Sequence, residues 1–348
     1  MKRFIFLCFL LFCEYQEFPK EGITLKGAIK FSDSYVNIPI IFTHQETLYL
    51  FLYSENGSGF MQIYSLKNDP TSPDILKEDT LYPFSFIDEY EYFYPFLVYV
   101  SWEYRECYEE SLELRVLNLE RISFPGVFVL KDTSVYFKIK ENFIYVLHGH
   151  RYLKIFNIDE TGGLTLIGDD TLSIYASGLD VYKNNLLIWG IEDTVFPLKE
   201  KIFIYDISEN IPTLKREYTV ENLSIRYAGI YKDFLILFDE KGPDKFLVEL
   251  YNMYDSLVLK KELIELTSVF EDIEEVKFYK EENSLYFMVK GYPLRILYEL
   301  TQSLECKEYT LDAERLAFYN NFIYAYIYDR RYYGDEEIHC VLIFEKEE

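Results

Sequence analysis

Few side chains in this sequence have the type and spacing that metal or acid–base chemistry requires. The 348 residues include only four histidines, of which His148 and His150 are two positions apart near the end of a predicted strand. Side chains two apart on a strand face the same side, so this pair could hold a metal ion if a third ligand stood nearby. The sequence identifies no third ligand, and we expect ordinary loop histidines and no metal.

Sequence motifs of common cofactor and catalytic chemistry are missing. The chain has no Gly-rich phosphate loop, no Gly-x-Ser-x-Gly nucleophile turn and no paired Cys motif. Paired carboxylates for glycoside hydrolysis carry no information here, because among 59 Asp and Glu residues some pair will always lie at a catalytic distance. We therefore expect no cofactor and assign no catalytic residue.

Aromatic and basic residues gather in or beside long segments between predicted strands, at 104–111, 192–200 and 329–337. On an otherwise acidic protein they would suit a glycan, a peptide or an acidic protein partner. Plain composition is the alternative, because the chain has 34 Tyr residues throughout. The candidate ligand-binding residues are Trp102, Tyr104, Arg105, His148, His150, Arg330, Arg331, Tyr332 and Tyr333.

Composition limits the class of protein and of partner. Hydrophobic residues make up 49% of the chain and aromatic residues 19%, which favours a folded, strand-rich protein over a disordered one. The net charge of -24 is spread along the chain and repels polyanions, so we expect no nucleic-acid partner. Acidic side chains on outward strand positions would also keep such a protein soluble.

Two short patterns recur seven times each with a period of roughly 40 to 50 residues, which is typical of propeller blades. One pattern is an apolar strand that follows a tight turn rich in Asn and Asp, so each copy predicts the second strand of a hairpin. The other predicts a third strand. Its central residues are Tyr64, Leu117, Phe156, Tyr205, Tyr251, Tyr298 and Phe344.

Each unit thus has an inner strand, a second strand, a third strand and an outer strand, except the last, which ends without an outer strand. The segment Gly22–Lys30 has the pattern of an outer strand and precedes the first inner strand. Pairing it with the C-terminal strand would remove two exposed edges. The sequence therefore predicts an all-β fold, a seven-bladed β-propeller of four-stranded antiparallel blades closed by its N-terminal strand.

Within this architecture, the connections from second to third strands and the starts of the inner strands share one face, here called the upper face, where ligand sites commonly gather. The predicted single propeller domain spans residues 21–348. One segment, Glu262–Val276, could be read as a short helix, but we interpret it as an outer strand and a linker.

The N-terminus has the pattern of an export signal at residues 1–13, followed by a short linker at 14–20. Lys2 and Arg3 precede the apolar run Phe4–Phe12, which ends at Cys13 and is too short to span a bilayer comfortably. It resembles a bacterial lipoprotein signal, with Phe12 where that pattern has a small residue, and the resemblance implies lipidation of Cys13. An ordinary export signal or an uncleaved strand are the alternatives.

Removal of such a signal would leave three cysteines, Cys107, Cys306 and Cys340, so no disulfide framework is expected. One bridge between two of them is compatible with the sequence. Cys306 and Cys340 fall on strands of neighbouring predicted blades.

Three units are similar to the LVIVD-repeat propellers, a bacterial family of mostly uncharacterised exported or surface proteins. In that repeat an apolar strand leads through a Pro-containing turn to an outer strand. The matching segments are Asn68–Pro73, Ile155–Ile158 with Leu164–Gly168, Tyr205–Leu214, and the inner-strand starts Tyr175–Gly178 and Tyr227–Gly229. Glu209–Ile211 stands where the repeat has its first Pro. The resemblance implies a propeller and an exported location, and no activity.

These observations favour a non-enzymatic, envelope-associated monomer that acts as a binding or assembly module. The partner would be a protein or glycan on the upper face, and a lipid anchor would be the only membrane contact. One alternative is a hydrolase or lyase that acts on a polysaccharide or peptide at the mouth of the channel. Another is a structural subunit of an envelope complex with no small-molecule site.

Overall fold

The structure is a computed structural model, and it describes residues 23–347 with gaps at 32–34, 55–58, 82–86, 105–109, 131–133, 193–198, 221–222, 243–244, 254–256, 266–271, 282–283, 293–294, 312 and 330–337. The predicted export signal and linker, residues 1–20, lie outside the described residues. No helix in the described part of the chain has the length and apolar character needed to cross a membrane.

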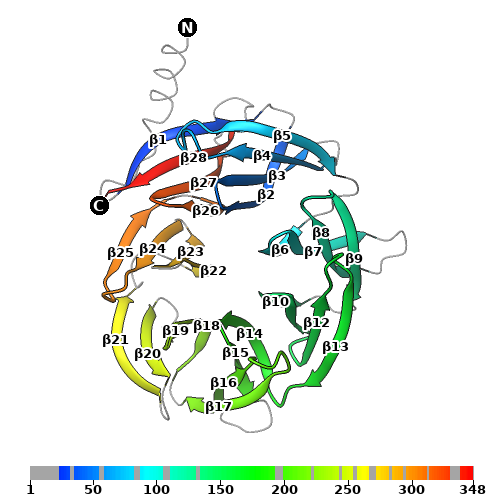
Figure 1. Ribbon diagram of the computed structural model, residues 1–348. Helices are drawn as coiled ribbons and strands as arrows, with labels where there is room; N and C mark the ends of the chain where they lie inside the picture. The colour runs from blue at the N-terminus through cyan, green and yellow to red at the C-terminus, as the bar shows by residue number, and fades with distance from the viewer. Residues whose placement is uncertain are drawn as a thin grey trace.

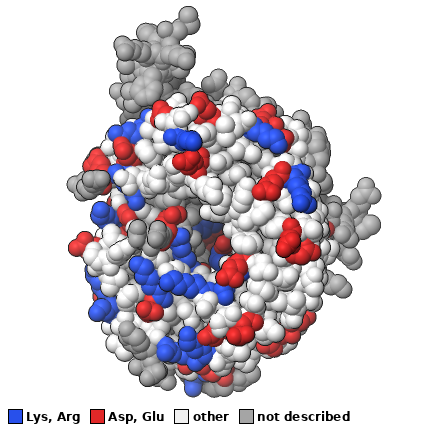
Figure 2. Space-filling model, viewed as in Figure 1, with Lys and Arg blue, Asp and Glu red and all other residues white. Residues whose placement is uncertain are grey.

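Seven four-stranded antiparallel sheets stand in a ring (Figure 1), and the space-filling view shows a hollow at its centre, here called the channel (Figure 2). The inner strands are β2 (Tyr35–His44), β6 (Ile87–Phe93), β10 (Val135–Lys140), β14 (Tyr175–Tyr182), β18 (Ile225–Tyr231), β22 (Asp272–Lys280) and β26 (Arg315–Tyr319). The second strands are β3 (Thr47–Ser54), β7 (Phe96–Tyr104), β11 (Phe143–His148), β15 (Asn185–Glu192), β19 (Phe234–Gly242), β23 (Leu285–Tyr292) and β27 (Phe322–Asp329).

The third strands are β4 (Gly59–Ser65), β8 (Glu110–Asn118), β12 (Tyr152–Ile158), β16 (Lys199–Asp206), β20 (Lys245–Met253), β24 (Arg295–Leu300) and β28 (Ile338–Lys346). The outer strands are β5 (Asp74–Leu81), β9 (Ser123–Leu130), β13 (Leu164–Thr171), β17 (Thr213–Val220), β21 (Leu257–Glu265), β25 (Cys306–Thr310) and β1 (Ile23–Lys30). We number the blades 1 to 7 in the order of these lists. The predicted seven-bladed propeller is confirmed.

The two ends of the described chain close the ring together. In Figure 1 the blue strand β1 lies beside the red strand β28, and the two pair antiparallel from Ile23 with Lys346 to Lys30 with Cys340. The N-terminal strand is therefore the outer strand of blade 7, as the sequence predicts. Ile23 and Ile29 are buried in this position, so β1 contributes apolar area as well as hydrogen bonds.

Apolar side chains hold each blade against the next. The described residues form seven hydrophobic clusters, and each cluster combines residues from two neighbouring blades. Leu147 of blade 3, for example, belongs to the same cluster as Ile188 of blade 4. This is why the middle strands are apolar at successive positions: both faces of each blade are buried against neighbours.

The tight turns between inner and second strands contain left-handed backbone, and in one of three turns it falls on an Asn, as the sequence suggests. Positive φ angles occur at Lys183 (52°), Lys232 (56°) and Asn320 (52°), the first residue of each turn. The Asn184 and Asp233 that follow the two lysines are not among the left-handed residues. Hairpin twist sets the position that must be left-handed, and residue preference follows it only in part.

Three turns between third and outer strands share one hydrogen-bond pattern. Asp69 Oδ1 accepts from the Thr71 backbone N–H at 2.9 Å, and Asp159 Oδ1 accepts from that of Thr161 at 2.7 Å. Asp206 Oδ1 likewise accepts from the Ser208 N–H. In each case the hydroxyl of the Thr or Ser and backbone N–H groups lower the pKa of the aspartate. These turns belong to the three units that resemble the LVIVD repeat.

The described residues decide two points that the sequence left open, the conformation of segment 262–276 and the state of two cysteines. Strand β21 runs through Glu265 and β22 starts at Asp272, so the part of 262–276 that is described is extended and not helical. Cys306 and Cys340 are free thiols on β25 and β28, and no disulfide joins them.

Replacing Gly27 with Val should lower the free energy of unfolding by about 1–3 kcal/mol. A Cβ atom at Gly27 of β1 would lie 2.0 Å from the carbonyl oxygen of Thr71, which belongs to blade 1, so the closing strand would have to move. Urea denaturation measures the change. The control is Ala28→Val at the next, exposed position, which should stay within about 0.5 kcal/mol of the parent. Equal effects of the two changes would contradict this packing argument.

Candidate functional site: the charged channel and its rim

Most of the sequence-predicted rim residues cannot be placed. Arg105, Arg330, Arg331, Tyr332 and Tyr333 lie outside the described residues. Trp102 and Tyr104 occupy the last part of β7, which ends at the upper face, and their side chains are likewise not described. Of the predicted set, the structure therefore describes the surroundings of the two histidines alone.

His148 and His150 have separate partners. The His148 ring is buried and stacks on Tyr152 with 5.2 Å between ring centroids. The His150 ring stacks on Tyr175 at 4.4 Å, and its Nδ1 lies 3.0 Å from the carbonyl oxygen of Ala176. His150 thus joins blade 3 to the start of blade 4 at the upper face. Among the described residues, no group of three or more His, Cys, Asp and Glu side chains could hold a metal ion.

The inner strands bring together a cluster of charged side chains that the sequence analysis did not identify. Figure 2 shows a hollow at the centre of the ring, surrounded by basic and acidic side chains. The chain as a whole has 59 acidic and 35 basic residues, so a cluster with equal numbers of acidic and basic side chains differs from the average of the protein. The cluster comprises Glu89 and Glu91 on β6, Lys138 on β10, Asp180 on β14, Glu275, Lys277 and Lys280 on β22, and Arg315 on β26.

The lower tier of this cluster consists of Glu91, Lys138, Asp180 and Lys280. The first three each stand two positions before the last residue of their inner strands, so they lie at one level near the lower end of the channel. Lys138 forms an ion pair with Glu91, which joins blade 3 to blade 2. The carboxylate of Glu91 raises the pKa of Lys138 against the opposing effect of burial.

Asp180, in the lower tier, accepts hydrogen bonds from two other blades. Lys280 Nζ donates to both of its carboxylate oxygens, at 2.5 and 2.6 Å, and to the carbonyl oxygen of Val181 at 2.7 Å. The backbone N–H of Ile230 also donates to Asp180, at 2.8 Å. A lysine of blade 6 thus reaches past blade 5 to blade 4, and a single buried carboxylate connects three blades.

The upper tier consists of Glu89, Glu275, Lys277 and Arg315, which stand nearer the upper face. Lys277 Nζ lies 3.0 Å from Glu275 Oε1, and Glu89 lies 3.8 Å from Lys138 Nζ. Burial raises the pKa of Glu89 to about 7, although Lys138 opposes the shift. Burial and the Arg315 guanidinium lower the pKa of Lys277 to about 8. Both groups therefore change charge close to neutral pH, which is common at functional sites.

Changing Glu89 to Gln should remove one pH-dependent loss of stability. The pKa of Glu89 is about 7 in the folded chain against an ordinary value of 4.5. Its stabilising contribution is therefore present below pH 4.5 and disappears as the pH rises through 7. Between pH 5 and pH 8 the free energy of unfolding of Glu89→Gln should therefore increase by roughly 1–2 kcal/mol relative to that of the parent, after allowance for solvent in the channel.

Urea denaturation of both proteins at the two pH values measures this gain. The control is Glu160→Gln, which removes an exposed carboxylate from a turn and should leave the pH dependence unchanged. A stability difference between parent and Glu89→Gln that does not vary with pH would show that Glu89 titrates normally.

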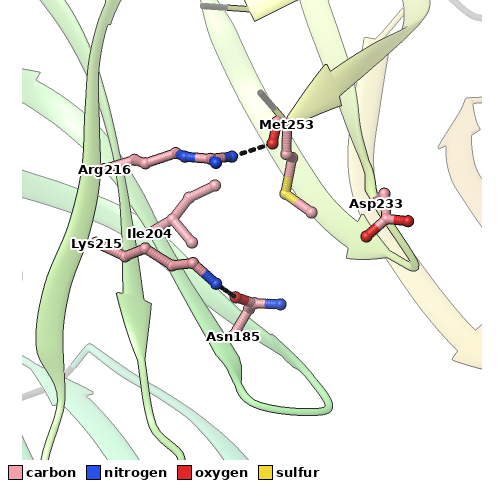
Figure 3. Close-up of a pocket in the computed structure, with 6 residues that line it drawn as sticks. All are labelled: Asn185, Ile204, Lys215, Arg216, Asp233 and Met253. Atoms are coloured by element: carbon pink, nitrogen blue, oxygen red, sulfur yellow. Dashed lines mark hydrogen bonds between the residues drawn. The ribbon is translucent and has the colours of Figure 1, made fainter. Parts of the chain in front are cut away.

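A separate pocket of about 190 Å³ lies at the lower face between blades 4 and 5 (Figure 3). Its two cationic side chains are engaged: Arg216 donates to the carbonyl oxygen of Met253, and Lys215 Nζ lies 3.3 Å from Asn185 Oδ1. Ile204 and Asp233 complete the lining. The pocket is small and its basic groups already have protein partners, so we place the candidate site in the channel.

Comparison with known proteins identifies the fold but no family and no activity. Neither a family model nor a curated protein sequence matches the chain. Among solved structures, a chain of the S. cerevisiae complex of Dbp5 with Nup159, Gle1, IP6 and ADP is 9% identical, with a TM-score of 0.55 and coverage of 95% of this chain and 97% of that one. What this chain shares with it is the propeller fold.

Two further solved structures are similar in the same way. The WD40 β-propeller domain of Doa1 is 12% identical, with a TM-score of 0.54 and coverage of 94% of this chain and 97% of that domain. The uncharacterised protein lmo1340 from Listeria monocytogenes EGD-e is 13% identical, with a TM-score of 0.50 and coverage of 86% and 91%. At such low identities the likeness extends to the fold alone.

Proposed function

We propose that the chain is a non-enzymatic binding or assembly module that receives its partner at the upper face. The observation that carries this proposal is the lower tier of the channel, in which Asp180 and Lys280 are paired with each other across three blades. Groups paired in this way hold one another in place, so we assign them a structural role and not a catalytic one. The two groups whose pKa values are shifted toward neutral pH, Glu89 and Lys277, stand in the upper tier.

The proposed setting is the cell envelope, with Cys13 as a lipid-anchored first residue and the propeller as a monomer outside the cytoplasm. The apolar run before Cys13 supports export. Membership of the LVIVD-repeat family is part of the proposal, and the common Asp-based turns at Asp69, Asp159 and Asp206 support it. The partner class is a protein or a glycan, and the net charge of -24 argues against nucleic acid.

Binding of defined peptides and glycans to the chain from Glu14 onward tests the proposal. Any ligand found is remeasured with Arg330→Ser and Arg331→Ser, two residues of the predicted rim, and we expect each change to weaken binding by about tenfold or more. Lys67→Ser, at an exposed turn on the lower face, is the control. Unchanged affinity in these two variants would show that the segment 329–337 is not part of the binding site.

The second candidate function is a hydrolase or lyase acting on a polysaccharide or peptide at the channel mouth. It is favoured by one observation, the pKa of about 7 at Glu89, which suits a carboxyl group to donate or accept a proton at neutral pH. Turnover of a polysaccharide or peptide that Glu89→Gln abolishes, while binding persists, would establish this function in place of the first.

A further inference from the structure

We propose that the pocket of about 190 Å³ at the lower face binds a free α-amino acid with a small apolar side chain. The carboxylate of the ligand lies against Arg216 of blade 4, and its ammonium group lies against Asp233 of blade 5 (Figure 3). The pocket is on the opposite face from the proposed partner site, so this inference goes beyond the proposed function and does not depend on it.

A β-bulge brings two consecutive basic side chains to this pocket. Residues of a strand normally alternate between its two faces, so neighbouring side chains point apart. Arg216 pairs with Ile204 of β16, and the register then shifts, so Lys215 has no partner on that strand. Lys215 and Arg216 both line the pocket as a result. Bulges often redirect a side chain in this way beside a functional site.

The positive charge of Arg216 is available to an anion. The partly buried guanidinium donates to the carbonyl oxygen of Met253, which is a neutral acceptor. Within the described ranges Arg216 forms no ion pair. A guanidinium has five N–H donors, so several remain for the carboxylate of a ligand after the bond to Met253.

Lys215 is less available than Arg216. Its Nζ lies 3.3 Å from Oδ1 of Asn185. The pKa of Asp206 is lowered mainly by hydrogen bonds from Ser208 and also by Lys215, so Asp206 lies close enough to offset the charge of this lysine. Arg216 is therefore the main group for binding a carboxylate.

A carboxylate stands on the other side of the pocket. Asp233 is exposed in the turn between β18 and β19, and its backbone carbonyl accepts from the Met253 N–H at 3.0 Å, which holds the turn against β20. The side-chain oxygens of Asp233 have no hydrogen bond or ion pair to any residue that the structure describes. Figure 3 shows Arg216 and Asp233 on opposite sides of Met253. The pocket thus has a cation on one side and an anion on the other.

This arrangement of charges selects a dipolar ligand. Two cations, Lys215 and Arg216, are matched by two anions, Asp206 and Asp233, so the surroundings favour a ligand without net charge. A simple anion would satisfy Arg216 but would be repelled by Asp233. A free amino acid has one carboxylate and one ammonium group on the same carbon atom, and so it satisfies both sides.

The size and the apolar lining of the pocket define the rest of the ligand. Its volume lies below the roughly 300–1,000 Å³ of pockets that hold drug-sized molecules, so the ligand is small. Ile204 and Met253 are the apolar residues of the lining, and both are buried. A methyl or isopropyl side chain can contact them, whereas a charged side chain would lose hydration there.

The methionines of the chain provide a local measurement. The full chain carries four, and Met253 lines the pocket, while Met61 and Met288 are buried between other pairs of blades. The experiment labels the methionine methyl groups and follows their NMR signals during titration with alanine or valine, with Met253→Leu to assign the signal. We expect a saturable shift of the Met253 methyl signal and no shift of the other two.

Derivatives of alanine test each end of the ligand. N-Acetylalanine lacks the ammonium group and alaninamide lacks the carboxylate, so each should bind about tenfold or more weakly than alanine. Glutamate should bind more weakly than valine, because its second carboxylate meets the apolar side chains of the lining.

Variants make the assignment specific to this pocket. Arg216→Gln and Asp233→Asn should each weaken the binding of alanine about tenfold. The matched control is Lys260→Gln, at the corresponding bulge of β21 in blade 5, which should keep the affinity of the parent. If Arg216→Gln fails to fold, Asp233→Asn at its exposed turn decides the question.

Absence of a saturable Met253 shift with alanine and valine would overturn the proposal. Equal binding of N-acetylalanine, or unchanged affinity in Asp233→Asn, would show a site for anions only and would overturn the assignment to an amino acid. Tighter binding of glutamate than of valine would overturn the assignment of an apolar side chain. None of these measurements involves Arg330 or Arg331, so the proposed function stands or fails separately.

Discussion

Replacing Lys280 with Met is expected to lower the free energy of unfolding by about 3–5 kcal/mol. The change leaves the Asp180 carboxylate, which is 2% exposed, with the Ile230 N–H but without its cation. An unpaired buried charge is the costly state, and the pair itself contributes much less. Urea denaturation at pH 7 measures the loss.

Two further variants separate the cost of the unpaired charge from other effects. Lys67→Met makes the same substitution at an exposed turn and should leave stability within about 0.5 kcal/mol. The double change Lys280→Met with Asp180→Leu removes both charges and should recover most of the loss. A double variant as unstable as Lys280→Met alone would mean that packing, and not the carboxylate, causes the effect.

Deletion of residues 1–30 is expected to abolish cooperative folding. It removes β1, whose Ile23 and Ile29 are buried, and leaves the edge of β28 unpaired. The two isoleucines contribute about 1.5–3 kcal/mol each, and the lost strand pairing adds to this, against a total stability of roughly 5–15 kcal/mol. Thermal unfolding and size-exclusion chromatography should show no cooperative transition and aggregated protein.

The matched control is deletion of residues 1–20, which leaves β1 in place. This shorter deletion should keep the melting temperature and the elution volume of the full chain. A cooperative transition in the longer deletion at an unchanged temperature would show that blade 7 is stable with three strands.

The sequence predicts the blades because each blade is local. Its second and third strands follow one another with a recurring apolar pattern, so the strands around Tyr64 or Tyr205 could be assigned from neighbouring residues. The closing strand was also predictable, since both the missing strand and the surplus strand were visible at the two ends. Short turns and strand periodicity determine these features.

The charged cluster was not predictable, because its members meet only at the centre of the closed ring. Lys280 and Asp180 are 100 residues apart, and Lys138 and Glu91 are 47 apart, so no local spacing joins them. Charges at alternate positions of a strand, as at Glu89 and Glu91 of β6, predict an exposed face in isolation. Burial of that face depends on the neighbouring blades, which periodicity alone does not specify.

The pairing of β1 with β28 also determines the order in which the protein can assemble. Blades 1 to 6 each consist of four consecutive strands, so each can form soon after its last strand leaves the ribosome. Strand β1 is synthesised before the other described strands but has to wait for β28, which is synthesised after them. Until then the edge strands at the opening are unprotected, and this interval is when a chaperone would be needed most.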